Sequence, residues 1–181
     1  TGSGQSYKLY NWGDGTNTTD TGCKYRIEEV EMPQVSNDQT YYWYTMCTPL
    51  RYSRYATGKG AGEALVGETE ATLASQWKLT TRTDGSYNII CRADGTFVSP
   101  NSANNTALRT VVDEPSAGWR ISPAATLGYY IITSGTAQFN QTNNATLNWN
   151  VYNWGGGTNT TDTGCQYLFA LRKRQNQFPR V

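Results

Sequence analysis

Two nearly identical segments carry an aromatic ring, amides and a carboxylate at the same spacing. Residues 10–23 read YNWGDGTNTTDTGC and residues 152–165 read YNWGGGTNTTDTGC, so thirteen of the fourteen positions are identical. Flat rings cover the apolar faces of pyranose sugars, and amides and carboxylates bond to hydroxyls. The segments are therefore candidate sugar-binding loops. The side chains concerned are Trp12, Asn17, Asp20, Trp154, Asn159 and Asp162.

Two other interpretations of these segments stay open from the sequence. In the first, the Thr, Asn and Asp side chains bond to the loop backbone, the Trp fills the end of a barrel, and a duplication explains the identity. In the second, Asp20 or Asp162 belongs to a calcium site, because Ca²⁺ takes oxygen ligands. The favoured prediction contains no metal ion and no cofactor.

Most familiar catalytic chemistry lacks its residues here. The 181 residues include no His, which removes the commonest general base and the commonest metal ligand. A glycosidase needs two carboxylates about 5–9.5 Å apart, whereas Asp84, Asp113 and Glu114 are typical of solvated turns. A formal net charge of +1 and the lack of a long apolar run argue against nucleic-acid binding and a membrane span. We expect a protein that is not an enzyme.

The composition indicates the elements that position these residues. Aromatic residues make up 13% of the chain, and Thr, Asn and Gly are abundant. Aromatic and β-branched residues suit half-buried strands, and Gly and Asn suit turns. Small–x–aromatic–x–apolar patterns centred on Trp77, Trp119 and Tyr167 predict strands with one buried face. The pattern of the last strand also occurs around Tyr25.

These strands divide the chain into three similar units between residues 38 and 172. A tyrosine-rich strand opens each unit, at residues 41–46, 85–90 and 128–133. Asp94-Gly95 and Ser134-Gly135 are hairpin signals within the second and third units. One such unit cannot bury its apolar face alone, but three can close a barrel. We predict an all-β chain with the β-trefoil plan, which has three four-strand repeats and pseudo-threefold symmetry.

From residue 38 to residue 172 the chain resembles the ricin-type β-trefoil lectin-like domains, especially those appended to secreted bacterial glycoside hydrolases. The resemblance rests on the strands at Trp77, Trp119 and Tyr167, on the Asp94-Gly95 turn and on residues 152–155. The family carries a Gln two residues before the aromatic, where this chain has Ser75, Ala117 and Cys165. Of the family's sugar-contacting positions only Asp94 and Tyr152-Asn153 match, loosely and in different repeats.

The two ends of the chain lie outside the predicted trefoil. Residues 1–37 are a half-repeat and connector, and the basic residues 173–181 are a solvated tail. The half-repeat at residues 6–30 has three interpretations: the end of a preceding trefoil, a hairpin packed on this one, or a segment that exchanges with its C-terminal equivalent. The four Cys are predicted to be buried thiols rather than a zinc or redox site, and they are Cys23, Cys47, Cys91 and Cys165.

The resemblance implies a non-catalytic carbohydrate-binding module, accessory to a glycan-degrading enzyme and located outside the cell, in the periplasm or on the cell surface. Its partners would be a glycan and a catalytic domain of the same polypeptide. The predicted carbohydrate-binding residues are Tyr152, Asn153, Trp154, Asn159, Asp162, Trp12, Asp20 and Asp94. A structural or protein-interaction spacer is the alternative, because the repeats lack the family's amide.

Overall fold

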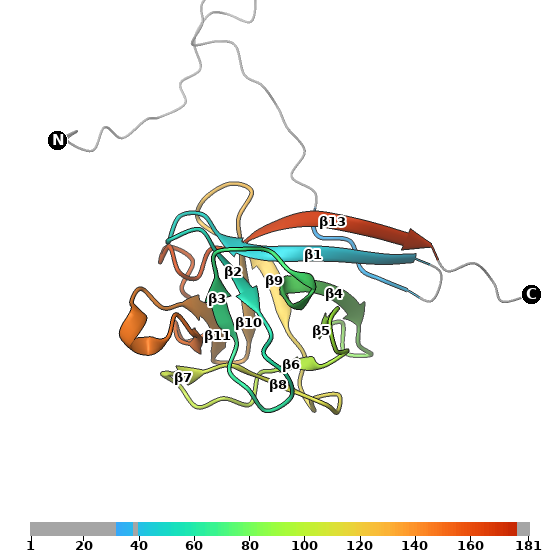
Figure 1. Ribbon diagram of the computed structural model, residues 1–181, viewed down its shortest axis with the longest axis horizontal. Helices are drawn as coiled ribbons and strands as arrows, with labels where there is room; N and C mark the ends of the chain where they lie inside the picture. Colours follow the sequence, from blue (N-terminus) through green and yellow to red (C-terminus); the bar gives the residue numbers. More distant parts are fainter. Residues whose placement is uncertain (1–31, 38–39, 177–181) are drawn as a thin grey trace, which may run out of the picture. The chain divides into compact units, whose positions relative to one another are not determined.

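A computed structural model of the chain describes residues 32–37 and 40–176, and these described residues belong to one compact unit (Figure 1). The described residues form short strands joined by turns, with two single-turn 3₁₀ helices. The elements of the first repeat are β1 (Thr40–Thr48), β2 (Arg54–Thr57), β3 (Val66–Glu68), η2 (Leu73–Ser75) and β4 (Gln76–Thr81). Those of the second are β5 (Tyr87–Cys91), β6 (Phe97–Ser99), β7 (Thr106–Ala107), β8 (Arg109–Val111) and β9 (Arg120–Pro123). Those of the third are β10 (Tyr130–Ser134), β11 (Ala137–Gln141), η3 (Ala145–Leu147), β12 (Val151–Asn153) and β13 (Leu168–Asn176).

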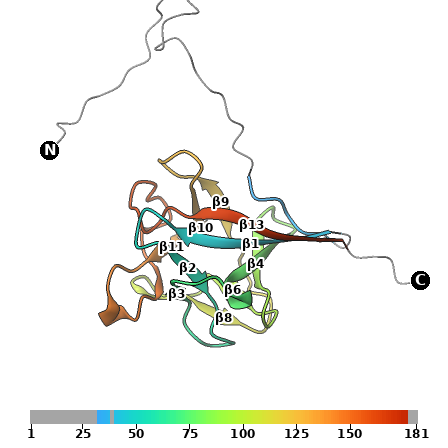
Figure 2. The ribbon, with the colours of Figure 1, turned by 45° about the horizontal axis from the view of Figure 1, so that its top comes forward.

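The first and last strands of the repeats close a barrel. Strand β4 pairs with β1 and β5, β9 pairs with β10, and β13 returns to pair with β1. Figures 1 and 2 both show β13 lying along β1. Isolated β-bridges complete the barrel. In the second and third repeats, each bridge joins the first strand of the repeat to the aromatic residue near the end of the same repeat. The three equivalent pairs are Tyr44 with Trp77, Tyr87 with Trp119, and Tyr130 with Tyr167.

The remaining strands form three hairpins that meet around the same axis. Their third-strand residues bond to one another in a ring, because the backbone N–H of Leu65 donates to Leu108 O, that of Leu108 to Val151 O, and that of Val151 to Leu65 O. The three N···O distances are 2.8, 2.8 and 2.9 Å. All three side chains are fully buried. This cyclic pattern confirms the threefold β-trefoil prediction; in the second repeat the third strand is split into β7 and β8.

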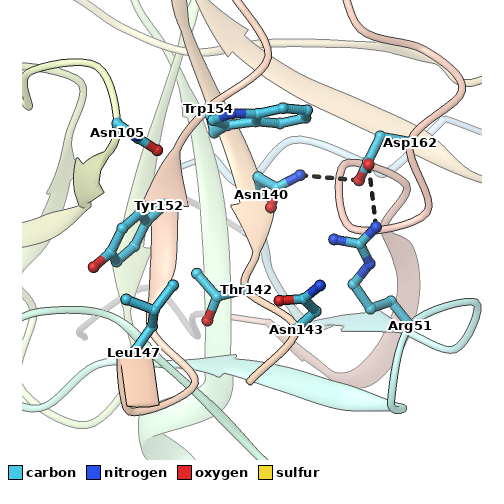
Figure 3. Close-up of a pocket in the computed structure, with 9 residues that line it drawn as sticks. All are labelled: Arg51, Asn105, Asn140, Thr142, Asn143, Leu147, Tyr152, Trp154 and Asp162. Atoms are coloured by element: carbon cyan, nitrogen blue, oxygen red, sulfur yellow. Dashed lines mark hydrogen bonds and ion pairs between the residues drawn. The ribbon is translucent and has the colours of Figure 1, made fainter. Parts of the chain in front are cut away.

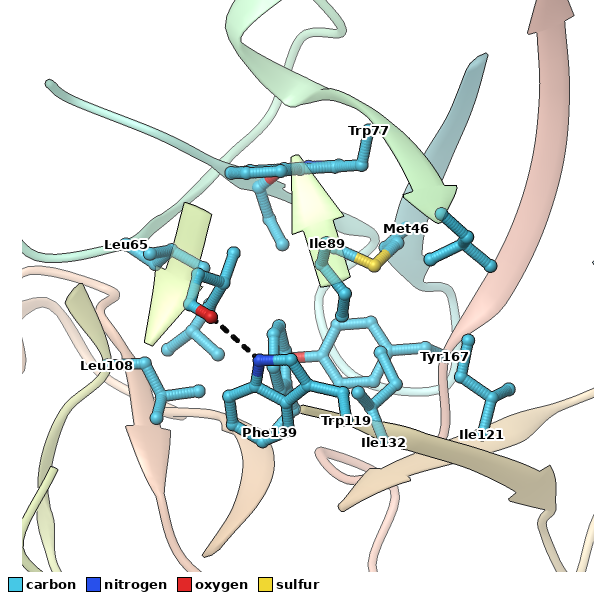
Figure 4. Close-up of a cluster of buried hydrophobic side chains, with 14 of the residues drawn as sticks. Met46, Leu65, Trp77, Ile89, Leu108, Trp119, Ile121, Ile132, Phe139 and Tyr167 are labelled. Carbon is cyan, nitrogen blue, oxygen red and sulfur yellow. Dashed lines mark hydrogen bonds between the residues drawn. The ribbon is translucent and has the colours of Figure 1, made fainter. Parts of the chain in front are cut away.

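Buried apolar side chains from all three repeats form the core (Figure 4). Trp77, Trp119 and Tyr167 are fully buried, which confirms that they occupy equivalent interior positions. The rings of Trp119 and Tyr167 pack edge-on against Phe139, at centroid distances of 4.8 and 5.8 Å. Aromatic rings of this size dominate burial in small cores.

Cysteine side chains add to this interior. Cys47, Cys91 and Cys165 are buried and form no disulfide in the described part of the chain. Burial raises the pKa of both Cys91 and Cys165 to about 11. These three thiols act as small apolar side chains, as predicted; Cys23 lies outside the described residues.

The predicted C-terminal boundary needs a correction. Strand β13 continues to Asn176, so the described residues of the segment predicted as a solvated tail, 173–176, are strand. Thr40–Trp43 of β1 supply the backbone partners that extend the ladder. Sequence periodicity gave no signal for this extension, since backbone pairing rather than a buried face defines it. The predicted N-terminal half-repeat lies outside the described residues.

Candidate functional site

A pocket of about 290 Å³ lies on the third repeat, where that repeat meets the first (Figure 3). The indole of Trp154 lies across one side of it, above the Asn140 amide, and Tyr152 and Leu147 form another side. Arg51 enters from the β1–β2 turn of the first repeat. The full lining is Arg51, Asn105, Asn140, Thr142, Asn143, Leu147, Tyr152, Trp154 and Asp162.

Trp154 presents its ring to this pocket and to solvent. It follows β12 directly, and its backbone N–H donates to Gln138 O at 3.0 Å, which fixes the start of the loop. The residue is 40% exposed. The interpretation in which this Trp fills the end of the barrel is therefore wrong, because a residue that fills the barrel would be buried.

Asp162 and Arg51 form an ion pair in the pocket wall. Arg51 Nη2 lies 3.1 Å from Asp162 Oδ2, and both side chains are about one-fifth exposed. Asp162 Oδ1 accepts from Asn140 Nδ2 at 3.0 Å and from the backbone N–H of Gly164 at 2.8 Å. Arg51 also donates through Nε to Thr163 Oγ1 at 3.1 Å. Asp162 therefore already has a cationic partner, which argues against the calcium interpretation at this residue.

The loop from Trp154 to Gln166 is held by its own polar groups and by strand β11. Asn159 Oδ1 accepts from the backbone N–H of Asp162 at 2.9 Å. The buried Gln138 side chain accepts from Asn159 N and donates to Asn159 O. Gly157 has a φ of +77°, and a Cβ there would lie 2.1 Å from Gly135 O. The prediction that polar side chains of the loop bond to the loop backbone is thus correct. These hydrogen bonds hold the loop that carries Trp154 in place.

Several pocket-lining polar groups are available to a ligand. Among the described residues, no partner is found for the hydroxyl of Tyr152, the indole N–H of Trp154 or the side-chain amide of Asn105. Asn143 is exposed and bonds only weakly, through its Oδ1 to Asn144 at 3.2 Å. Donors and acceptors thus surround an aromatic face. The two charged residues among the described lining, Arg51 and Asp162, neutralise each other.

The predicted site residues divide into two groups. Trp154, Tyr152 and Asp162 come together in the pocket. Asn153 is buried behind it, where its side chain accepts from Gln138 N and donates to Ser102 O. Asn159 braces the loop rather than lining the pocket.

Asp94, by contrast, belongs to a different place in the fold. It lies in the β5–β6 turn of the second repeat, where its Oδ1 accepts from Thr96 N at 3.0 Å and Thr96 Oγ1 at 2.7 Å. The structure therefore gives it a turn-forming contact and no place in the pocket. Trp12 and Asp20 lie outside the described residues.

Sequence reasoning missed the residues that other elements bring to the pocket. Arg51 and Asp162 are separated by 111 positions, and no local pattern links them. Asn140 lies on β11 just beyond the predicted strand, is 5% exposed and gave no signal beyond its amide. Asn105 adopts a left-handed backbone at φ +65°, which Asn tolerates and which a loop signal alone cannot locate.

Two further observations concern catalysis and membranes. Within residues 32–37 and 40–176, His, Cys, Asp and Glu form no group of three or more that could hold a metal ion. The helices in the same ranges are single 3₁₀ turns, none of which has the length to cross a bilayer.

Solved structures share this fold. The designed threefold-symmetric protein ThreeFoil matches with a TM-score of 0.57 and 15% identity, over 70% of this chain and 96% of that one. A ricin B-like lectin of Macrolepiota procera, solved with lactose, matches with a TM-score of 0.56 and 17% identity, over 75% of this chain and 97% of that one. The chain has the β-trefoil fold that these two structures share.

A larger enzyme contains the same fold. The endo-β-galactosidase of Clostridium perfringens that releases GlcNAcα1-4Gal matches with a TM-score of 0.54 and 11% identity, over 75% of this chain and 33% of that one. This chain thus corresponds to a third of that protein's length. No family model matches the chain, and no curated protein sequence matches it. At such identities the likeness concerns the fold alone.

Proposed function

We propose that this domain is a non-catalytic carbohydrate-binding module and that its site is the Trp154 pocket. The observation that carries the proposal is a partly exposed indole bordering a small pocket whose polar groups are neutral or mutually neutralised. Such a combination suits a neutral polyhydroxylated ring. The C–H face of the sugar would lie on the indole, and its hydroxyls would bond to the free amide and phenol groups.

The size of the pocket favours a single sugar ring. A volume of about 290 Å³ lies at the lower end of the roughly 300–1,000 Å³ typical of small-molecule sites. The pocket is formed by residues of three repeats, since Arg51 comes from the first, Asn105 from the second and Trp154 from the third. Folding of the whole trefoil would therefore be needed to assemble it.

The biological setting belongs to the same proposal. We assign the binding domain to the trefoil, whose described strands run from Thr40 to Asn176, and place it outside the cell, as the accessory domain of a glycan-degrading enzyme. The lactose complex of the Macrolepiota lectin and the enzyme from Clostridium support this setting by likeness of fold. In such an arrangement the module would hold the enzyme near its polymer, and weak single-site affinity would gain from multivalency. Trp12 and Asp20 of residues 10–23 would form an equivalent site, provided that other residues complete it as those of the other repeats complete the Trp154 pocket.

A glycan array followed by calorimetric titration of the best neutral glycan tests the proposal. Trp154→Ala is expected to weaken binding at least about tenfold, because the stacking contact between the indole and a sugar ring contributes about one kcal/mol or more of binding free energy. Its melting temperature should stay close to that of the parent, since the ring is exposed. Tyr129→Ala, which removes an aromatic of the same repeat outside the pocket lining, is the matched control and should bind normally.

Two results would contradict the proposal. One is that no glycan binds the folded protein at millimolar concentration. The other is that Trp154→Ala binds a glycan as tightly as the parent. Either would favour the alternative in which the trefoil is a spacer or docking domain.

A further inference from the structure

A pair of aromatic rings lies on the two loops that flank the pocket. Tyr52 belongs to the β1–β2 turn and Trp149 precedes β12. Their ring centroids are 5.2 Å apart and the ring planes meet at 67°, an edge-to-face contact. Tyr52 is 59% exposed, so most of its ring is open to solvent.

Both residues have left-handed backbones that bulky side chains rarely adopt. The φ angles are +60° for Tyr52 and +55° for Trp149. Such a conformation costs about 1–2 kcal/mol for a residue with a Cβ. It persists only where the surroundings hold it, and residues of this kind concentrate at functional sites.

The surroundings of Trp149 supply that restraint. Its carbonyl accepts from Gly67 N at 2.8 Å and from Gln141 Nε2 at 2.7 Å. The guanidinium of Arg54 stacks 3.7 Å from the centroid of the indole, and its Nη1 donates to Gly67 O at 2.8 Å. Arg54 thus covers one face of the indole, and contacts within the protein hold Trp149 in place.

Each ring of the Tyr52–Trp149 pair lies within two positions in the sequence of a residue that lines the pocket. Tyr52 directly follows Arg51, and Trp149 lies two residues after Leu147; both Arg51 and Leu147 line the pocket. Leu147 is 36% exposed and Leu50 is 40% exposed, so apolar surface accompanies the rings.

We propose that Tyr52 and Trp149 form a second subsite, which holds the adjacent ring of an oligosaccharide whose first ring occupies the Trp154 pocket. This inference rests on the proposed function. It names the ligand class as a neutral oligosaccharide of at least two rings rather than a monosaccharide. Contact with a pre-ordered aromatic ring adds binding energy without an ordering cost, so affinity should rise with chain length.

The test compares affinities for ligands of increasing length. The probes are galactose, glucose and N-acetylglucosamine with their β-1,4-linked dimers, trimers and tetramers, measured by calorimetry on the full chain. For the sugar that binds, the parent is expected to bind the dimer or trimer at least about tenfold more tightly than the monomer. In Tyr52→Ala this ratio should fall close to one, whereas Tyr52→Phe should retain it.

Tyr52→Asn keeps the test independent of folding. Asn tolerates the left-handed backbone better than Tyr, so this variant should fold at least as well as the parent and still lose the length dependence. A parent that binds monomer and oligomers equally, or a Tyr52→Asn variant that keeps the full ratio, would overturn the second subsite while the pocket stands. If no saccharide binds at all, both this inference and the proposed function are wrong.

Discussion

At the scale of single residues, Asp162 determines the charge of the pocket wall. Its two carboxylate oxygens accept hydrogen bonds from Arg51, Asn140 and the backbone of Gly164. The ion pair with Arg51 makes the site electrically neutral. The hydrogen bond that the Asn140 side-chain amide donates to Asp162 orients this amide beneath Trp154 (Figure 3). A single acidic residue therefore both stabilises the loop and shapes the ligand environment.

Asp162→Ala is expected to lower the free energy of unfolding by about 1–3 kcal/mol. The reason is that a partly buried guanidinium and an amide lose their charged acceptor. Urea denaturation at pH 7 measures the change. Asp113→Ala removes an exposed carboxylate for which the described residues show no partner, and it should change stability by less than about 0.5 kcal/mol. Equal effects of the two substitutions would argue against a structural role for the ion pair.

Asp94 is expected to contribute a pH-dependent part of the free energy of unfolding and to have no effect on ligand binding. Burial alone would raise its pKa, but hydrogen bonds from the Thr96 N–H and hydroxyl outweigh burial and lower it. Because the folded pKa lies below the unfolded value of about 3.9, the stabilisation is present above about pH 4 and is lost as pH falls through the folded pKa.

The variant Asp94→Asn isolates this contribution. Its deficit in unfolding free energy relative to the parent should be larger at pH 7 than at pH 2.5, and its glycan affinity should match the parent's. Denaturant titrations at the two pH values measure the difference. A deficit that is constant or grows toward low pH would refute the assignment.

At the scale of elements, the loop from Trp154 to Gln166 depends on close backbone approach. Gly157→Ala should lower stability by at least about 2 kcal/mol, because it adds a clash with Gly135 O to the cost of a left-handed residue. Gly156→Asp is the matched control. Gly156 has a similar φ of +67°, but a Cβ there meets no atom within 4 Å.

The Asp introduced in the control variant occurs at the equivalent position of the other copy of the segment. Asp14 occupies the equivalent position in the N-terminal copy, and it is the sole difference between the two segments. Gly156→Asp should therefore cost about 1 kcal/mol or less, since Asp tolerates this backbone. Thermal melts of both variants give the comparison, and a larger loss for Gly156→Asp would contradict the role given to Gly157.

Prediction from sequence succeeded where one local pattern determines an element. Alternation around Trp77 and Trp119 located the last strands of two repeats, and Asp94-Gly95 located a hairpin turn. It failed where pairing between distant segments decides the outcome. Arg51 reaches the pocket only because β13 closes the barrel against β1, and the same ladder turns the predicted tail into strand. The left-handed backbones of Tyr52 and Trp149 likewise follow from tertiary contacts that their residue types do not indicate.

At the scale of the whole molecule, the threefold symmetry is imperfect at one informative position. The indole N–H groups of Trp77 and Trp119 each donate at 2.8 Å to a carbonyl, of Ala56 and Val98 respectively. The equivalent aromatic of the third repeat is Tyr167, whose buried hydroxyl has no hydrogen-bond partner among residues 32–37 and 40–176. Burial raises the pKa of this hydroxyl well above its usual value, so it remains neutral.

This asymmetry predicts opposite responses to Phe. Tyr167→Phe should leave the unfolding free energy unchanged or raise it by up to about 1 kcal/mol, because it removes an unsatisfied polar group. Trp119→Phe should lower it by about 1–3 kcal/mol, because it leaves the Val98 carbonyl unpaired and opens a cavity. Urea denaturation measures both. Substantial destabilisation by Tyr167→Phe would mean that the hydroxyl has a partner in solution.

The central claim is that a neutral saccharide binds against Trp154. The most direct measurement is a ¹H–¹⁵N NMR titration of the full chain with the best glycan from the array, in which the indole N–H signals are assigned by single Trp→Phe variants. The account predicts that the Trp154 indole and the amides of Asn105 and Asn143 shift, while the buried Trp77 and Trp119 indoles stay in place. Saturable shifts centred elsewhere, with the Trp154 signal unmoved, would contradict it.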